Sequence, residues 1–178
     1  IPSKGESGDD MPYAPFDGIV LTDTFQLYEQ DKDMIADLLP DNSDRRTAQK
    51  KRDIRVIVGN PPYVAEKGVS YPNLDALINS SYVEPSKANL SNKVYDNYIR
   101  AYRWATERLK EKGDDRGVLA FVSGSGWIER GFADGMRKSL CEDFSNLYII
   151  HLRGDIRKNM LSGGAAGEGG NIFESGSM

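Results

Sequence analysis

The sequence predicts an α/β fold built around a largely parallel, doubly wound sheet. Short apolar segments rich in β-branched residues alternate with stretches of helical periodicity, and this alternation is typical of parallel strands covered by helices. The segment GVLAFVS at residues 117–123 is almost continuously apolar, as expected for a strand that is buried on both faces. The 178 residues, 39% of them hydrophobic, suffice for one domain with a core. Ligands of such folds bind beyond the carboxyl ends of the strands.

The chain begins with an irregular lead-in, a strand and a helix. Residues 1–16 contain three prolines and many small or acidic residues, which predicts irregular structure. The run GIVLTD at 18–23 predicts a buried strand that ends in an acid. Residues 31–39 have helical character, and Pro40 is expected to end that helix because proline cannot continue it. The charged residues 41–53 predict a solvated stretch.

A second strand and a long loop follow. The run IRVIVG at 54–59 is apolar and β-branched, and it predicts another buried strand. Between residues 64 and 92, the pairs Tyr71-Pro72 and Glu84-Pro85 interrupt the pattern. We therefore expect a long loop with at most short helices, and loops of this length in compact domains are commonly functional.

The second half of the chain continues the alternation. Residues 91–113 carry apolar side chains at helical spacing between a capping serine or asparagine and a final glycine, and they predict an amphipathic helix. A shorter helix is predicted at 132–142 and a buried strand at 147–152. Residues 153–171 are rich in glycine and predict a flexible loop, after which the strand containing Phe173 opens.

Two consecutive prolines follow the strand at 54–59 and are flanked by Asn60 and Tyr63. Proline fixes φ, and the residue before a proline is confined to extended conformations, so Asn60 is held still. The Asn60 side-chain oxygen and the Pro61 carbonyl would accept two hydrogen bonds from a planar amino group, and its lone pair would then point at an electrophile. A ring at Tyr63 would stack on a base. The pattern favours chemistry at a planar amino group.

Several segments resemble known enzymes. The Asn60-Pro61-Pro62-Tyr63 motif is similar to the catalytic motif of amino-methyltransferases that use S-adenosylmethionine, and GIVLTDTFQL resembles the adenine-contacting motif of the DNA adenine-N6 subgroup. The segments KVYDNYIRAYRWATERL, GVLAFVSGSGWIERGFADGMRKSL and IIHLRGD resemble, in this order, the elements that follow in large single-polypeptide restriction-modification enzymes, which are similar to type I systems fused into one chain. The resemblance spans residues 16–178.

This resemblance implies a Rossmann-like, S-adenosylmethionine-dependent methyltransferase fold, with residues 17–178 forming the catalytic part of one domain. It implies that Asp23 contacts the adenine of the cofactor, with Thr24 and Phe25 beside it in the cofactor-binding site. Family members also carry an upstream strand with a glycine-rich turn and a further strand whose acid binds the ribose. Neither is found in this sequence, so we expect an incomplete fold whose first two strands are missing.

The resemblance also assigns the target site. Asn60, Pro61, Pro62 and Tyr63 are implied to be catalytic, with Asn60 and Pro61 holding the amino group of an adenine flipped out of DNA. Tyr63 would stack on one face of the target base and Phe173 on the other. The remaining domains of the parent polypeptide are further expected partners, and we expect the isolated chain to be inactive.

Simpler interpretations stay open for parts of these motifs. Asp23 also suits a helix cap, Phe173 a place in the core, and the proline motif a tight turn. The glycines at 124–131 do not have the spacing of a dinucleotide fingerprint, and those at 163–170 lack the Lys-Ser/Thr ending of a phosphate loop. Neither stretch is a convincing cofactor loop.

Three functions stay open at this point. The first is DNA adenine-N6 methylation within a restriction-modification enzyme, the second is methylation of another planar amide or amine such as a protein glutamine, and the third is a non-catalytic remnant that only binds. The net charge of −4 does not indicate DNA binding by bulk electrostatics. The single cysteine, with no signal sequence and no apolar run of about 18 residues, predicts a cytoplasmic protein without membrane contact, and the resemblance to restriction-modification enzymes implies a bacterial one. No constellation indicates a metal site.

Overall fold

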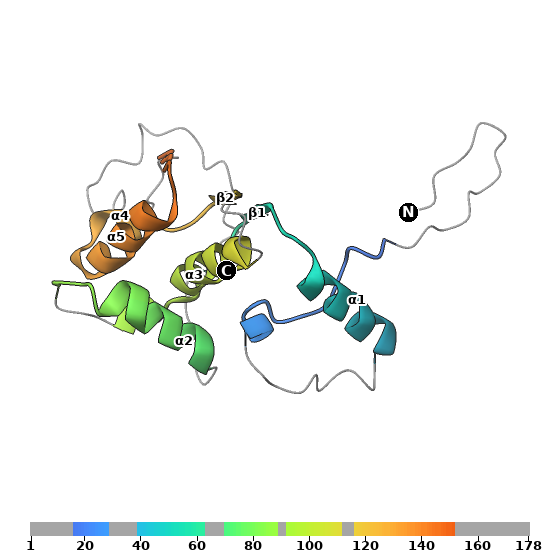
Figure 1. Ribbon diagram of the computed structural model, residues 1–178. Coiled ribbons are helices and arrows are strands. Elements are labelled where there is room, and N and C mark those ends of the chain that lie inside the picture. Colours follow the sequence, from blue (N-terminus) through green and yellow to red (C-terminus); the bar gives the residue numbers. More distant parts are fainter. Residues whose placement is uncertain (1–15, 29–38, 63–69, 89–91, 112–115, 152–178) are drawn as a thin grey trace, which may run out of the picture. The chain divides into compact units, whose positions relative to one another are not determined.

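The computed structural model describes residues 16–28, 39–62, 70–88, 92–111 and 116–151. The chain divides into two units, residues 1–143 and residues 144–178, and the described helices and strands all belong to the first unit (Figure 1). In chain order they are the 3₁₀ helix Phe25–Tyr28, α1 (Pro40–Lys51), β1 (Val56–Gly59), α2 (Pro72–Ile78), the π-helical turn Asn79–Val83, the 3₁₀ helix Asn92–Tyr95, α3 (Asn97–Lys110), β2 (Val118–Phe121), α4 (Gly126–Glu129), the 3₁₀ turn Gly131–Ala133 and α5 (Asp134–Asp143).

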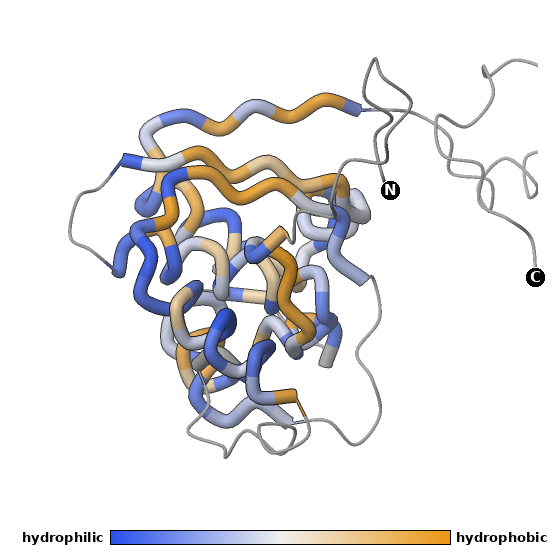
Figure 2. Tube along the Cα trace, turned by 90° about the vertical axis from the view of Figure 1, so that its right-hand side faces the viewer, coloured by the Kyte–Doolittle hydropathy of each residue, from blue (hydrophilic) through white to orange (hydrophobic). Residues whose placement is uncertain are grey.

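The strands β1 and β2 pair in parallel, with Val56 beside Val118 and Gly59 beside Phe121. Both strands were predicted from their apolar β-branched runs, and Figure 2 shows hydrophobic residues along them. The helix α3 connects them in sequence, as a parallel pair requires. One face of the sheet packs against this helix. The ring of Tyr102 in α3 meets that of Phe121 in β2 edge-on, with 5.2 Å between the ring centres.

The opposite face of the sheet is apolar and uncovered. Val56, Val58 and Val118 are 60%, 74% and 58% exposed. In parallel sheets both faces are normally covered, so bare valines here mark a surface that other parts of the polypeptide are expected to cover.

The core of the first unit lies among α2, the π-helical turn, α3 and α5. The predicted amphipathic helix and the predicted short helix correspond to α3 and α5, although α3 begins at Asn97 after a separate 3₁₀ turn. No helix among the described residues is long and apolar enough to cross a membrane. The largest fully buried side chains are Tyr82, Leu74, Ile78, Ile99, Met136, Leu140, Val94 and Thr106.

Two prolines that we had interpreted as a helix end and as a break within a loop begin helices instead. Pro40 is the first residue of α1, which runs through the charged stretch predicted to be solvated, and Pro72 is the first residue of α2. Proline suits the first helical position because its φ is already helical and the N–H that it lacks would have no partner there. The region predicted as a loop is therefore continuously helical from Pro72 to Val83. The helix predicted at 31–39 lies outside the described residues, except for Leu39.

Two predicted strands are wrong in this structure. The described residues 18–23 form no strand, with Ile19 67% and Leu21 63% exposed, and the described residues 147–151 form none either, with Tyr148 87% exposed. A strand needs a neighbouring strand for its main-chain hydrogen bonds. The sequence shows apolar character but not whether such a neighbour is present.

A buried arginine fixes the end of α1 ahead of β1. Arg108 of α3 is 6% exposed, and its Nη2 donates hydrogen bonds to the carbonyl oxygens of Gln49 (3.0 Å), Lys50 (2.9 Å) and Arg52 (2.9 Å). A cation at a helix C-terminus satisfies carbonyls that have no partner within the helix. This contact ties α1 and the approach to β1 onto α3.

Candidate active site

The proline motif lies at the carboxyl end of β1, where a parallel sheet places its ligands. The main-chain N–H of Val122 donates to the carbonyl of Gly59 at 3.0 Å, which fixes the last residue of the strand. Asn60 and Pro62 are exposed, whereas Pro61 is buried. Tyr63 and Phe173, the two residues predicted to stack on the target base, lie outside the described residues.

The predicted cofactor residues form a short turn. Asp23 accepts a hydrogen bond from the main-chain N–H of Phe25 at 3.0 Å, and it therefore caps the 3₁₀ helix that begins at Phe25. The alternative that we drew from the sequence, Asp23 as a cap, is thus part of the structure. It does not exclude a ligand, because each carboxylate oxygen has two lone-pair sites.

A hollow of about 510 Å³ joins the predicted cofactor turn to the proline motif. Asp23, Thr24 and Phe25 line one part of it, and Pro62 lines another. Its size lies within the range of ligand-binding clefts. Its full lining is Leu21, Thr22, Asp23, Thr24, Phe25, Arg46, Pro62, Tyr71 and Asn97.

Three lining residues, Arg46, Tyr71 and Asn97, were missed in the sequence. Tyr71 was noted only as the partner of a proline that interrupts the chain, and Arg46 as part of a charged stretch. Asn97 is buried at the start of α3, and its Oδ1 accepts a hydrogen bond from Arg100 at 3.4 Å. No short motif marks these positions, since they meet only through the packing of α1, α2 and α3.

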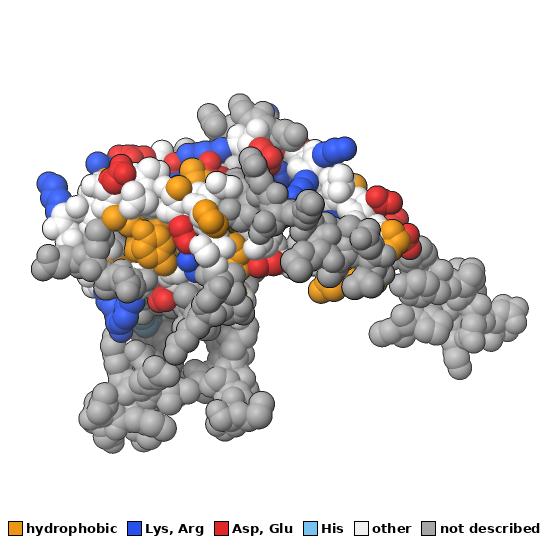
Figure 3. Space-filling view, turned by 90° about the horizontal axis from the view of Figure 1, so that it is seen from below, with side chains coloured by type: hydrophobic (Ala, Val, Ile, Leu, Met, Phe, Trp, Pro, Cys, Tyr) orange, Lys and Arg blue, Asp and Glu red, His pale blue; other side chains and the backbone are white. Residues whose placement is uncertain are grey.

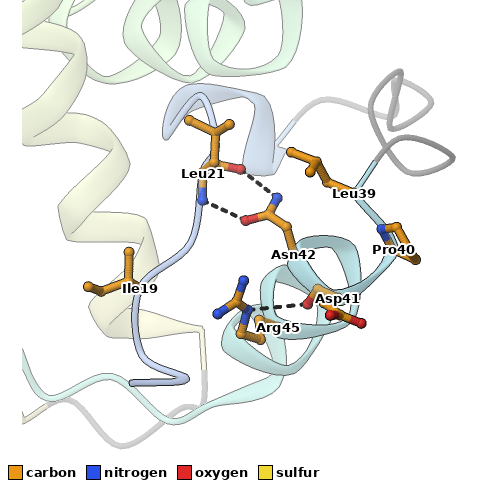
Figure 4. A pocket seen from close by; sticks show the side chains of 7 residues that line it. All are labelled: Ile19, Leu21, Leu39, Pro40, Asp41, Asn42 and Arg45. Atoms are coloured by element: carbon orange, nitrogen blue, oxygen red, sulfur yellow. Dashed lines mark hydrogen bonds between the residues drawn. The ribbon is translucent and has the colours of Figure 1, made fainter. Parts of the chain in front are cut away.

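Leu21 also lines a second hollow, of about 480 Å³ (Figure 4). The amide of Asn42, near the start of α1, accepts a hydrogen bond from the Leu21 N–H at 2.7 Å and donates one to the Leu21 carbonyl at 2.9 Å. This amide occupies the main-chain groups of Leu21 as a neighbouring strand would. It thereby fixes the chain two residues before Asp23.

Tyr71 is the most heavily contacted aromatic residue at the first hollow. It is 4% exposed, and its hydroxyl donates a hydrogen bond to Asp23 Oδ2 at 2.8 Å. Its ring meets that of Phe25 edge-on at 5.2 Å, and the Arg100 guanidinium lies 5.3 Å from the ring centre. Arg100 in turn makes two hydrogen bonds of 2.8 Å to the carboxylate of Asp75 in α2.

The loop after β2 is fixed beside the end of the sheet. The hydroxyls of Tyr102 and Ser123 lie 3.0 Å apart, and burial raises the pKa of Tyr102, so that its phenol stays protonated at neutral pH. Arg137 Nη1 donates to the carbonyls of Trp127 (2.7 Å) and Arg130 (2.9 Å). The glycine-rich stretch 124–131 is therefore a packed turn around α4.

Comparison with known proteins identifies the family. Residues 18–157 match the model of the Eco57I restriction-modification methylase family. The chain belongs to this family. The matched region includes the Asp23 turn and the proline motif but not Phe173. The resemblance to single-polypeptide restriction-modification enzymes is thereby confirmed, and a comparison with curated proteins gave no match.

Solved structures that are similar to this chain agree with its assignment to the Eco57I family. The ATP-dependent Type ISP restriction-modification enzyme LlaBIII bound to DNA is 40% identical, with a TM-score of 0.64 over 72% of this chain and 9% of that chain. A nuclease-deletion mutant of the Type ISP enzyme LlaGI with a DNA substrate mimic is also 40% identical, with a TM-score of 0.73 over 85% and 13%. The DrdV–DNA complex is 38% identical, with a TM-score of 0.64 over 74% and 13%. The chain thus spans about a tenth of the length of these relatives.

Proposed function

We propose that this chain is the catalytic part of a DNA methyltransferase that methylates the N6 amino group of adenine within a restriction-modification polypeptide. The observation that carries the proposal is the hollow that joins Asp23, Thr24 and Phe25 to Pro62 of the proline motif. Its support is the membership of the Eco57I restriction-modification methylase family. The fold would be a Rossmann-like methyltransferase sheet of which β1 and β2 are two strands.

The hollow suits the adenosine end of S-adenosylmethionine. Asp23 offers carboxylate oxygens to an exocyclic amino donor, and the half of the hollow around Phe25 and Leu21 is apolar enough for a base. When bound, the cofactor supplies an electrophilic methyl group. No described residue forms the glycine-rich turn expected at its methionine end, so other parts of the polypeptide would complete that site.

The residues at the end of β1 would act on the target base. The Asn60 side-chain oxygen and the Pro61 carbonyl would accept hydrogen bonds from the adenine amino group, orient its lone pair and stabilise the charge that develops on the nitrogen. Tyr63 and Phe173 would hold the flipped base between their rings. The amino group would lose its proton after the transfer, so the site needs no strong general base.

Other domains would supply most of the DNA contacts. On the face shown in Figure 3, Lys and Arg side chains are interspersed with Asp and Glu, and no continuous basic surface is visible among the described residues. The net charge of −4 agrees with this. All three of these solved relatives are described in complex with DNA or a DNA mimic, which supports DNA as the partner of the whole polypeptide.

The test is identification of the methylated product. The complete polypeptide is incubated with methyl-labelled S-adenosylmethionine and duplex DNA, and the nucleosides are separated after digestion. We expect the label in N6-methyl-2′-deoxyadenosine. Label found only in protein would point to a glutamine methyltransferase, and label in neither would support a non-catalytic remnant.

A further inference from the structure

We propose that Tyr71 is a positioning residue that sets the orientation of Asp23 for recognition of the cofactor's adenine amino group. The inference rests on the proposed function, because it assumes that Asp23 faces a cofactor. It goes beyond that function in naming the residue that fixes the carboxylate and in predicting a selectivity.

The carboxylate of Asp23 is held at both oxygens. Its Oδ1 accepts from the main-chain N–H of Phe25 at 3.0 Å, and its Oδ2 accepts from the hydroxyl of Tyr71 at 2.8 Å. Asp23 itself is exposed, so without these two bonds its side chain would be free to rotate. Each oxygen keeps capacity for one more hydrogen bond, and Asp23 and Tyr71 both line the hollow.

Tyr71 can orient Asp23 because it is itself fixed. The ring is 4% exposed, packs edge-on against Phe25 and lies under the guanidinium of Arg100. Arg100 is held by two bonds to Asp75, and a bidentate pair of this kind fixes both partners in direction as well as distance. The helices α2 and α3 therefore set the position of the Tyr71 hydroxyl, although neither contains Asp23.

A carboxylate fixed in this way would distinguish an amino group from a carbonyl oxygen. An exocyclic amino group donates a hydrogen bond to it, whereas an oxygen in the same place would bring two acceptors together. A freely rotating carboxylate would discriminate less, because it turns away from the unfavourable partner. Removal of the Tyr71 hydroxyl should therefore reduce the preference for an amino group over an oxygen more than it reduces the affinity for the cofactor.

The experiment measures binding of two probes to the complete polypeptide by calorimetry. The probes are S-adenosylhomocysteine and its deaminated analogue S-inosylhomocysteine, which has oxygen in place of the amino group. We expect Tyr71→Phe to lower the preference for S-adenosylhomocysteine about three- to tenfold, which corresponds to the net contribution of one typical intramolecular hydrogen bond. Phenylalanine keeps the ring that contacts Phe25 and Arg100, so the fold is retained.

Tyr82→Phe is the matched control. Its hydroxyl is also buried but has no hydrogen-bond partner among the described residues, so its loss should leave the preference unchanged. Asp23→Ala should abolish most of the preference. Addition of Tyr71→Phe to Asp23→Ala should then change nothing further, because a positioning residue acts only through its partner.

The possible results distinguish a failure of the role of Tyr71 from a failure of the proposed function. A preference that is lost in Asp23→Ala but unchanged in Tyr71→Phe overturns the role of Tyr71 and leaves the proposed function intact. An equal fall in Tyr82→Phe and Tyr71→Phe shows a merely structural effect and also overturns it. Absence of S-adenosylhomocysteine binding by the wild type contradicts the proposed function, and this inference with it.

Discussion

Asp134, the first residue of α5, connects that helix to the segment that follows the π-helical turn. Its carboxylate accepts hydrogen bonds from the hydroxyl of Ser86, from the main-chain N–H of Lys87 at 2.8 Å and from the N–H of Gly135 at 2.8 Å. The bond from Ser86, followed by those from the main chain, lowers the pKa of this carboxyl below its ordinary value. An acid at a helix N-terminus is also favoured by the helix dipole.

The pH dependence of stability should show the contribution of Asp134. Because its pKa is lower in the folded state, its stabilising effect is present above the ordinary value of about 4 and is lost as pH falls below it, through the folded-state pKa. Chemical unfolding at several pH values should show Asp134→Asn less stable than the wild type at pH 7, with the difference shrinking at acid pH. A difference that does not change with pH would contradict this role.

At the residue scale, the proline motif could be recognised in the sequence because its effect on the backbone comes from neighbouring residues. Consecutive prolines after an apolar run fix the backbone wherever they occur, and Asn60 was singled out for that reason. Tyr71 was missed because its importance comes from Asp23 and Arg100, which are 48 and 29 positions away along the chain. Side chains joined only by packing leave no pattern of spacing in a single sequence.

At the scale of elements, α5 and the π-helical turn approach each other closely at Gly135. A Cβ placed on Gly135 would lie 2.0 Å from the main-chain oxygen of Tyr82, a distance that requires the backbone to move. Gly135 is buried. Glycine at this position is therefore needed for packing.

Gly135→Ala should destabilise the chain by about 1–3 kcal/mol, the usual cost of overpacking, despite the higher helix propensity of alanine. Urea unfolding followed by circular dichroism gives the value. Gly131→Ala is the control, since a Cβ there would meet nothing within 4 Å. Equal stabilities of the two variants would show that the approach of α5 to Tyr82 is not limiting.

The same scale shows why some elements were predicted and others were not. β1, β2 and α3 have unambiguous periodicity, and they form where expected. Pro40 was interpreted as a helix end and Pro72 as a break within a loop, whereas both start helices, because proline is compatible with the first turn and incompatible only with later ones. The runs at 18–23 and 147–152 have strand composition, but composition does not reveal whether a partner strand is present.

At the scale of the whole molecule, the sheet is incomplete within the described residues. Two paired strands are covered on one face by α3 and bare on the other, where valines are 58–74% exposed. The chain also spans 9–13% of the solved relatives that it matches. Both observations agree with a site that needs other parts of a longer polypeptide.

We therefore expect the 178-residue chain to transfer no methyl group by itself. Labelled S-adenosylmethionine, duplex DNA and the isolated chain should give no labelled base, while the complete polypeptide gives N6-methyladenine under the same conditions. Turnover by the isolated chain would show that its 178 residues are sufficient for methyl transfer. The expectation of an incomplete cofactor site would then be wrong.

The proposed function depends most on Asn60, whose amide oxygen is proposed to accept a hydrogen bond from the target amino group. The most direct measurement is single-turnover methyl transfer to adenine by the complete polypeptide carrying Asn60→Ala, alongside calorimetric binding of S-adenosylhomocysteine and an Asn146→Ala control at an exposed asparagine. We predict that Asn60→Ala slows the chemical step about 100-fold or more and leaves cofactor binding within about twofold of the wild type, a difference of about 0.4 kcal/mol. An unchanged rate of methyl transfer in Asn60→Ala would contradict the account.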